Sequence, residues 1–274
     1  RAFAENMVED PLFAINLANR LWKELFGLAL ADPVDALDPA RLDPASPPPE
    51  PWTLQASHPE LLLRLAGELK NQDYSLREFL KTLLQSSAYQ LSSRYDGNWK
   101  YEYVTLFARH YPRRLEGEEI HDTIVNATGV GALYTITNGD PQSTAIRLPE
   151  PVEPRSNGGV LNFMNVFLRG NRDTVFRSQN GSILQQLTLM NDNFILNRLR
   201  VGSSPALTAI SRLGTNDEVV EEVFLRFLAR RPSENERKNA LKFLEGARTA
   251  ADRNAYIEDL AWVAINKVEF IFSY

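Results

Sequence analysis

Four short sequences of the form Ser/Thr-x-x-Glu constrain the fold of this chain more than any other feature. They begin at Ser57, Ser75, Thr215 and Ser233. In such a capping box the hydroxyl accepts a hydrogen bond from the third helical amide, and the glutamate reaches back to the amide of the cap residue. Each box precedes a segment with apolar residues at three- and four-residue spacing, which is typical of an amphipathic helix. The pattern therefore predicts four helix starts.

Further start and stop signals extend the helical prediction along the chain. Asp10-Pro11 predicts the start of a first helix and Gly27 its end, because proline suits the first helical turn and glycine suits the C-terminus. The same rules predict helices over 115–128, over 182–199 with a break at 191–192, and over 206–213. The expected fold class is mostly α, as an irregular multi-helix domain.

Two long stretches interrupt the helices. Residues 29–57 contain seven prolines, which remove backbone donors and favour an extended loop. Residues 130–178 are rich in Gly, Pro and Asn, and their β-capable pieces (132–137, 144–148 and 160–168) leave a small hairpin as an alternative to a loop. We expect one helical domain over 1–274. The alternative subdivision is an N-terminal half (1–129), an irregular insert (130–180) and a C-terminal half (181–274).

Composition excludes several classes of protein. A net charge of -5 over 274 residues argues against a nucleic-acid-binding protein, whose affinity would come from clustered Lys and Arg. The absence of Cys excludes disulfides, thiolate metal sites and a cysteine nucleophile. No apolar run approaches the roughly 20 residues that span a bilayer, so no membrane span is predicted. Because the chain starts on Arg1, we expect it to be part of a longer protein.

Polar residues on apolar segments predict a buried network. The closing segment 259–272 is apolar on nearly every side but carries Asn266 and Glu269, and the first helix carries Asn16, Asn19 and Arg20 on one face. An isolated buried charge costs several kcal/mol, on the order of the stability of a small domain. We therefore expect the two helices to pack together, with Arg20 paired to Glu269 or a nearby acid.

Glu118, His121 and Asp122 form a Glu-x-x-His-Asp cluster on one predicted helix face. Glu-x-x-His is the spacing of carboxylate-bridged di-iron bundles, but such a site also needs a second copy and two further glutamates. Neither other histidine, His58 or His110, has a glutamate three residues before it. The sequence therefore favours a solvated or salt-bridged helix face, no metal and no cofactor, with these three residues kept as catalytic candidates.

Two further groups of residues are candidates for function. His58 lies at a predicted helix N-terminus and could serve in acid–base chemistry with Glu60, although helix initiation explains both residues equally well. Arg169, Asn171 and Arg172 lie on an irregular segment and are the candidates for contact with an anion or a glycan, because the guanidinium fork matches carboxylates. The sequence favours the alternative, in which such arginines pair with the 35 acidic residues of the chain.

Several strings resemble the planctomycete-specific domain family, a domain of unknown function (family 1553), and they follow the order of that family across the chain. The strings are Asp10-Pro11-Leu12-Phe13-Ala14, Asn19-Arg20-Leu21-Trp22, Phe26-Gly27, His58-Pro59-Glu60-Leu61-Leu62, Ser86-Ser87-Ala88-Tyr89, Arg113-Arg114-Leu115, Glu118-Glu119-Ile120-His121-Asp122, Arg230-Arg231-Pro232-Ser233 with Glu236, and 260–272. The chain departs from the pattern at His121, where arginine is usual, and at Ser273-Tyr274. The resemblance implies a C-terminal module of an exported multidomain bacterial protein that often carries a cytochrome c-like domain, and a periplasmic or extracellular location.

The sequence contains no Gly-x-Ser-x-Gly, phosphate-binding loop or His-Glu-x-x-His motif. We therefore expect a non-catalytic structural or interaction module whose partners are other domains of the same protein or a separate protein. The alternative is an enzyme or binding domain that acts on polysaccharide or another anionic ligand through a cleft formed by the long loops. An aromatic run would suit either role, in the core or against sugar rings. It comprises Trp52, Tyr95, Trp99, Tyr101 and Tyr103.

Overall fold

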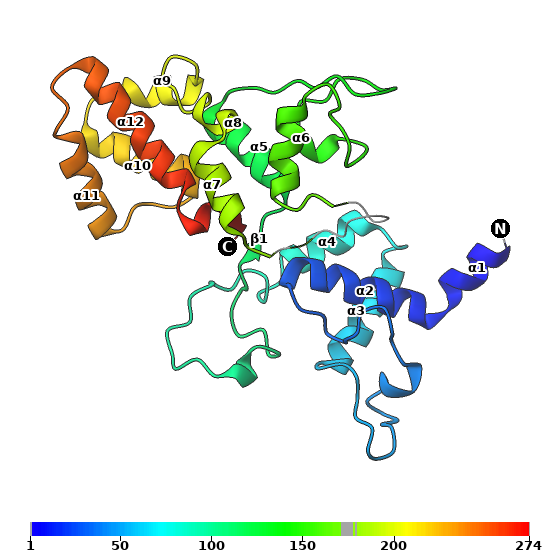
Figure 1. Cartoon of the computed structure of the whole chain (residues 1–274). Coiled ribbons are helices and arrows are strands. Elements are labelled where there is room, and N and C mark those ends of the chain that lie inside the picture. The colour runs from blue at the N-terminus through cyan, green and yellow to red at the C-terminus, as the bar shows by residue number, and fades with distance from the viewer. Residues whose placement is uncertain (1, 171–177, 179, 274) are drawn as a thin grey trace. The chain divides into compact units, whose positions relative to one another are not determined.

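The computed structural model describes residues 2–170, 178 and 180–273, and these residues form a mostly α-helical protein (Figure 1). The predicted fold class is confirmed. The chain divides into two compact units, which we call unit 1 (up to Arg113) and unit 2 (Arg114–Ser273). The predicted boundaries at 129 and 180 do not coincide with this division. Folding of 1–274 as one cooperative domain stays a prediction.

Unit 1 is built around helix α2, which starts and ends where the sequence predicts. Asp10 accepts a hydrogen bond from the Leu12 amide, Pro11 occupies the first turn, and Gly27 ends the helix in the left-handed region at φ 75°. The buried face of α2 packs against α3 and forms the core of this unit. The elements of unit 1 are α1 (Ala2–Glu9), α2 (Pro11–Phe26), the 3-10 turn η1 (Pro39–Arg41), α3 (Pro59–Asn71), α4 (Leu76–Leu84) and the 3-10 turn η2 (Tyr101–Tyr103).

The proline-rich stretch 29–57 is irregular, as predicted, and is tied back to unit 1 by a few polar contacts. An isolated antiparallel bridge joins Ala31 to Ala56, and Ser57 donates to the Leu30 carbonyl through both its amide and its hydroxyl. The capping box predicted at Ser57 is therefore wrong. His58 is the N-cap of α3 instead, and Ser57 makes a bridge to the preceding loop.

Unit 2 contains the remaining helices around a second core. The amide of Leu115 donates to the Ile271 carbonyl over 2.8 Å, next to the two-stranded sheet of β1 and β2, so the two ends of this unit meet. Its elements are β1 (Arg113–Arg114), α5 (Gly117–Thr128), η3 (Ala145–Arg147), α6 (Gly158–Val166), α7 (Ile183–Asn191), α8 (Asn193–Leu196), α9 (Pro205–Ser211), α10 (Asn216–Leu228), α11 (Glu234–Leu244), α12 (Ala250–Ile265), η4 (Val268–Ile271) and β2 (Phe272–Ser273).

Most predicted helix ends of unit 2 are confirmed. Thr215 and Ser233 form complete capping boxes with Glu218 and Glu236, and Gly129 ends α5 at φ 68°. In unit 1, Ser75 caps α4 by accepting from the Glu78 amide. Three further capping boxes have residues outside the Ser/Thr-x-x-Glu pattern, namely Glu116 with Glu119, Ser182 with Gln185 and Thr249 with Asp252.

The irregular stretch after α5 contains less β structure than its composition suggests. Residues 160–168 were expected to be β-capable, but Asn157 caps the Val160 amide and α6 covers most of this piece. Residues 144–148 contain the 3-10 turn η3. A single antiparallel bridge between Tyr134 and Gln142, closed by hydrogen bonds of 2.8 and 2.9 Å, is the nearest feature to the expected hairpin. Within the described residues, no helix is both long and apolar enough to cross a membrane.

Candidate functional site

Each of the two predicted polar seams has hydrogen-bond partners within its own unit. In α2, Asn19 is fully buried as expected, but it bonds to a loop of its own unit. Its amide donates to the Ala31 carbonyl over 2.8 Å, and its oxygen accepts from the Leu30 and Ala31 amides, both over 3.0 Å. Asn16 similarly donates to the Val34 carbonyl over 2.9 Å. These asparagines therefore hold the start of the proline-rich stretch.

The expected pairing of Arg20 with Glu269 is wrong. Arg20 is exposed and pairs with Asp35, while Glu269 accepts two hydrogen bonds from Arg230 over 2.6 and 2.9 Å. The helix α12 ends at Ile265, so Asn266 is its C-cap and Glu269 belongs to η4 rather than to the same helix. The sequence pattern failed because apolar residues continue past the end of the helix.

His58 is held as a structural residue rather than as half of an acid–base pair. Its Nε2 is 2.9 Å from the Thr105 carbonyl, and its ring lies 6.2 Å from that of Phe107. Glu60 is exposed in the first turn of α3. The structure therefore gives His58 a partner other than Glu60.

The Glu-x-x-His-Asp cluster of α5 is divided between two sets of partners. Glu118 is 3% exposed and accepts from Arg169 over 2.9 Å, and Arg169 also donates to the carbonyls of Glu150 and Glu153. Arg169 was a candidate for ligand contact, but it is 6% exposed and its charge faces a carboxylate inside the fold. The other two candidates of that segment, Asn171 and Arg172, lie outside the described residues.

The second part of the cluster forms a hydrogen-bonded chain of three side chains. His121 is fully buried, with Nδ1 2.8 Å from a carboxylate oxygen of Asp122 and Nε2 2.6 Å from the hydroxyl of Tyr134. Asp122 also accepts from the amides of Ala145 over 2.7 Å and Ile146 over 3.1 Å. We call this arrangement the Asp122–His121–Tyr134 chain.

Burial and hydrogen bonding set the protonation states of Asp122 and Tyr134 at the two ends of this chain. Burial alone would raise the pKa of Asp122, but hydrogen bonds from His121, Ala145 and Ile146 outweigh it and hold that pKa below its ordinary value. Burial raises the pKa of Tyr134 to about 12. Asp122 is therefore ionised and accepts from Nδ1 of His121, and the Tyr134 hydroxyl stays protonated at neutral pH and shares a hydrogen bond with Nε2.

Because both ring nitrogens of His121 are engaged, neither is free to bind a metal in this arrangement. The described residues also contain no cluster of three His, Asp or Glu side chains placed to hold a metal ion. The Glu-x-x-His spacing is accordingly explained by an ion pair and by a hydrogen-bonded chain on one buried helix face.

Tyr134 also lines an open pocket of about 460 Å³ in unit 2, which we call the Tyr134 pocket. Its walls come from the irregular stretch after α5, from the start of α6 and from α8 with the residues that follow it. The lining residues are Gly131, Ala132, Leu133, Tyr134, Asn157, Gly159, Val160, Asp192, Asn193, Phe194, Asn197 and Arg198. This volume lies within the range of small-molecule sites.

Arg198 is the cation of the Tyr134 pocket. Its guanidinium lies over the Phe194 ring, 3.9 Å from the centroid, and Nη1 donates to the Phe194 carbonyl over 3.1 Å. Its Nε is buried and has no hydrogen-bond acceptor among the described residues. Burial lowers the pKa of Arg198, and the neighbouring Tyr134 offsets part of this effect. Phe194 in turn stacks on His121 at 4.7 Å, which joins the pocket to the chain behind it.

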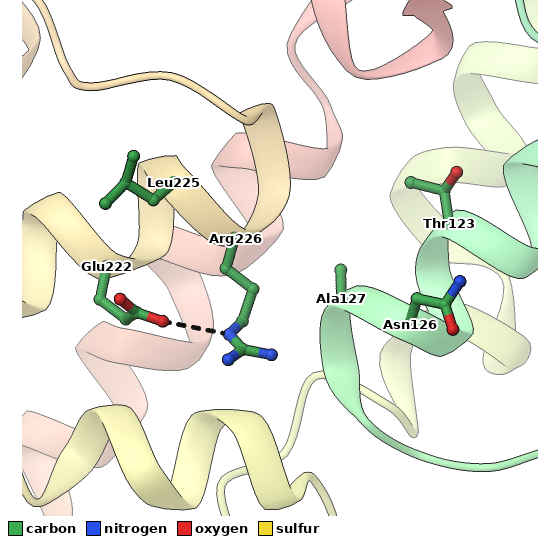
Figure 2. A pocket seen from close by; sticks show the side chains of 6 residues that line it. All are labelled: Thr123, Asn126, Ala127, Glu222, Leu225 and Arg226. Atoms are coloured by element: carbon green, nitrogen blue, oxygen red, sulfur yellow. Dashed lines mark hydrogen bonds and ion pairs between the residues drawn. The ribbon is translucent and has the colours of Figure 1, made fainter.

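A second pocket of unit 2 is lined by charged side chains that already pair with each other. It has a volume of about 470 Å³ and lies between α5 and α10. Figure 2 shows Thr123, Asn126 and Ala127 on one side, and Glu222 and Arg226 joined by an ion pair of 3.4 Å on the other. Pairs of this kind within a helix contribute only about 0.3–0.5 kcal/mol. We therefore place the candidate site at the Tyr134 pocket.

The aromatic run of unit 1 packs largely on itself. Trp99 lies edge-on to Tyr95 at 5.3 Å and to Tyr103 at 5.8 Å, and the Arg109 guanidinium covers it at 4.4 Å. Such a satellite cluster stabilises a long irregular segment. Tyr95, Trp99 and Tyr101 nevertheless remain exposed, as does Trp52, over whose ring Arg41 lies at 5.2 Å.

Sequence reasoning selected His121 and Asp122 but missed Tyr134 and Arg198. Tyr134 lies 13 residues from His121 in an irregular stretch, where no periodicity indicates which way a side chain points. Arg198 follows the break after α7, and its position depends on the turn from α8. The break at 191–192 was the one local signal near this wall of the pocket.

Comparison with known proteins gives one match. The family model PSD1, described as a protein of unknown function (DUF1553), matches residues 1–244. No curated protein and no solved structure matches the chain.

Proposed function

The chain belongs to the PSD1 (DUF1553) family of proteins of unknown function, and on this premise we propose that it is a non-catalytic module that binds a glycan in the Tyr134 pocket. The observation that supports the proposal is the Asp122–His121–Tyr134 chain, which holds the buried side chain of Tyr134 in one fixed orientation at the wall of an open pocket. A rigid polar group of this kind lowers the entropy lost when a polar ligand binds.

The side chains around the pocket suit the hydroxyls and ring faces of a sugar. Asn157, Asn193 and Asn197 are exposed and line the pocket, and an amide group can donate to one hydroxyl and accept from another. Tyr134 and Phe194 supply apolar ring surface beside them. A few polar groups on an otherwise apolar lining are typical of sites that fix the orientation of a small ligand.

The same lining argues for binding rather than hydrolysis. Most glycoside hydrolases use two carboxyl groups, about 5–5.5 Å apart in retaining enzymes and about 6.5–9.5 Å apart in inverting enzymes. Asp192 is the one carboxylate among the lining residues described, and it accepts the Phe194 amide over 2.7 Å as the cap of α8. Tyr134, whose pKa burial raises to about 12, is a poor nucleophile at neutral pH.

Gly131 offers a direct test of the proposal. A Cβ at Gly131, which lines the pocket, meets no atom within 4 Å, so Gly131→Trp would fill the pocket without a clash at Cβ. Gly202→Trp is the matched control, because Gly202 has the same clearance and does not line the pocket. On a glycan array, the wild type and Gly202→Trp should bind the same glycans and Gly131→Trp should lose them. A wild-type chain that binds no glycan would overturn the proposal.

We also propose that the module belongs to a larger exported protein in which other domains, or a protein partner, are its neighbours. The support is the sequence resemblance, whose relatives are exported multidomain proteins. The test is fractionation of the source cells followed by detection with an antibody against the module. We expect the protein in the periplasmic or extracellular fraction, with a mass well above that of the 274 residues described here. Recovery in the cytoplasmic fraction alone would contradict the proposal.

A further inference from the structure

The charge balance of the Tyr134 pocket points to the kind of sugar that it binds. Arg198 is the one cation and Asp192 the one carboxylate among its described lining residues, and no hydrogen bond or ion pair joins the two in the described structure. Asp192 is held at the start of α8 by the Phe194 amide. The described structure therefore gives the positive charge of Arg198 no carboxylate partner.

Arg198 is also partly withdrawn from water. The Phe194 ring covers one face of its guanidinium, and the buried Nε has no acceptor among the described residues. The titratable side chain that acts on Arg198 is Tyr134, whose hydroxyl stays protonated at neutral pH because burial raises its pKa to about 12. A half-buried cation attracts an anion more strongly than a cation in bulk water does.

We propose that the Tyr134 pocket selects an acidic sugar, and that the guanidinium of Arg198 pairs with the carboxylate of a hexuronate residue. This inference rests on the proposed glycan function. The planar fork of arginine matches a planar carboxylate, whereas a dianionic phosphate would call for a second cation that the described lining does not contain. The asparagine amides would then bind the sugar hydroxyls, with Tyr134 fixing the ring.

The test compares one oligosaccharide in three forms: an oligogalacturonate, its methyl ester and a neutral galactose oligomer of equal length. Isothermal titration calorimetry on the full chain should show the oligogalacturonate binding at least about tenfold tighter than the other two, because a charge-assisted hydrogen bond is lost with the carboxylate. A sulfated galactose oligomer of equal length should bind more weakly than the oligogalacturonate.

Arg198→Gln should abolish this preference and leave the affinity for the neutral oligomer within about threefold, since the amide contacts remain. Arg198→Lys keeps the charge without the fork and should retain part of the preference. Arg200→Gln is the matched control: Arg200 is exposed, pairs with Glu258 and does not line the pocket. Circular dichroism spectra should be unchanged in all three variants.

The outcomes separate the inference from the function on which it rests. Equal binding of acidic and neutral oligomers, a preference for the sulfated oligomer, or a preference that survives Arg198→Gln would overturn the acidic-sugar inference and leave glycan binding standing. Absence of binding to every form, in a chain that also binds nothing on the glycan array, would overturn both.

Discussion

Replacing Asn19 by leucine should destabilise unit 1 far more than its single side chain suggests. The two side chains branch at the same atom, so the change removes polarity with little change of shape. Asn19 is fully buried and satisfies three backbone groups, the carbonyl of Ala31 and the amides of Leu30 and Ala31. A buried group that loses its partner costs about 1–3 kcal/mol, so the loss of three partners in Asn19→Leu should lower the free energy of unfolding by about 3–9 kcal/mol. That is a large share of the roughly 5–15 kcal/mol typical of a folded domain.

Urea unfolding followed by tryptophan fluorescence measures this loss. Trp22 is buried in the same unit and stacks on Phe26 at 3.8 Å, so its emission reports on the packing of α2. Asn19→Asp gives a second measurement if the leucine variant does not fold. Its carboxyl group still accepts from both amides but adds a buried negative charge that faces the Ala31 carbonyl, so we expect a large loss at neutral pH that becomes smaller as the pH falls, because the protonated carboxyl can donate to that carbonyl.

The control for this series is Asn16→Leu, one turn earlier on the same helix. Asn16 is half-buried, donates one hydrogen bond to Val34 and accepts one from Arg20, whose side chain is exposed. Its replacement should lower the free energy of unfolding by no more than about 1.5 kcal/mol. If Asn19→Leu loses less than about 1 kcal/mol, or no more than Asn16→Leu, burial of these hydrogen bonds is not what makes Asn19 important.

The remaining predictions concern two glycine substitutions, one in each unit, and the pH dependence of stability. Gly117→Ala would bring a Cβ to 2.7 Å from the Met164 carbonyl oxygen and should destabilise the chain by about 1–3 kcal/mol. Gly67→Ala, whose Cβ meets no atom within 4 Å, should stabilise α3 by about 0.5–1 kcal/mol. Thermal unfolding measures both effects. Hydrogen bonds from Arg230 hold the pKa of Glu236 below its ordinary value. The ionised Glu236 carboxylate therefore contributes fully to the free energy of unfolding above about pH 4.3, and this contribution is lost as the pH falls further. Between pH 6 and pH 3 the free energy of unfolding of the wild type should fall by about 1–2 kcal/mol more than that of Glu236→Gln. The glutamine amide can still close the capping box, so the variant removes only the charge. Equal falls in the two proteins would contradict a stabilising role for the ionised Glu236 carboxylate.

Local signals in the sequence predicted the helices well because each depends on a few adjacent residues. Thr215 and Ser233 cap α10 and α11 as expected, and Gly27 and Gly129 end α2 and α5 in the left-handed region. Ser57 shows where this reasoning fails. Its hydroxyl had a second acceptor, the Leu30 carbonyl, brought close by a loop whose path the sequence does not specify.

Partners that are distant in sequence were not predictable in the same way. The burial of Asn19 followed from the apolar helix around it, but its partners are backbone groups of the proline-rich stretch, and backbone groups carry no signature in the sequence. Arg20 and Glu269 each had many acids or bases within the reach of the chain. The short path to Asp35 and the position of Arg230 decided the pairs.

The candidate site shows how far a spacing rule extends into three dimensions. The Glu-x-x-His spacing placed Glu118 and His121 on one face of α5, and that face is buried. A buried carboxylate requires a cation and a buried imidazole requires hydrogen-bond partners, so burial alone predicts that the two residues separate into an ion pair and a hydrogen-bonded chain. Arg169 and Tyr134 satisfy these requirements from the irregular stretch after α5. The fold thus turns a pattern that resembles a metal site into the supporting wall of a pocket, and the member of the hydrogen-bonded chain that lines this pocket, Tyr134, is one that no spacing rule selects.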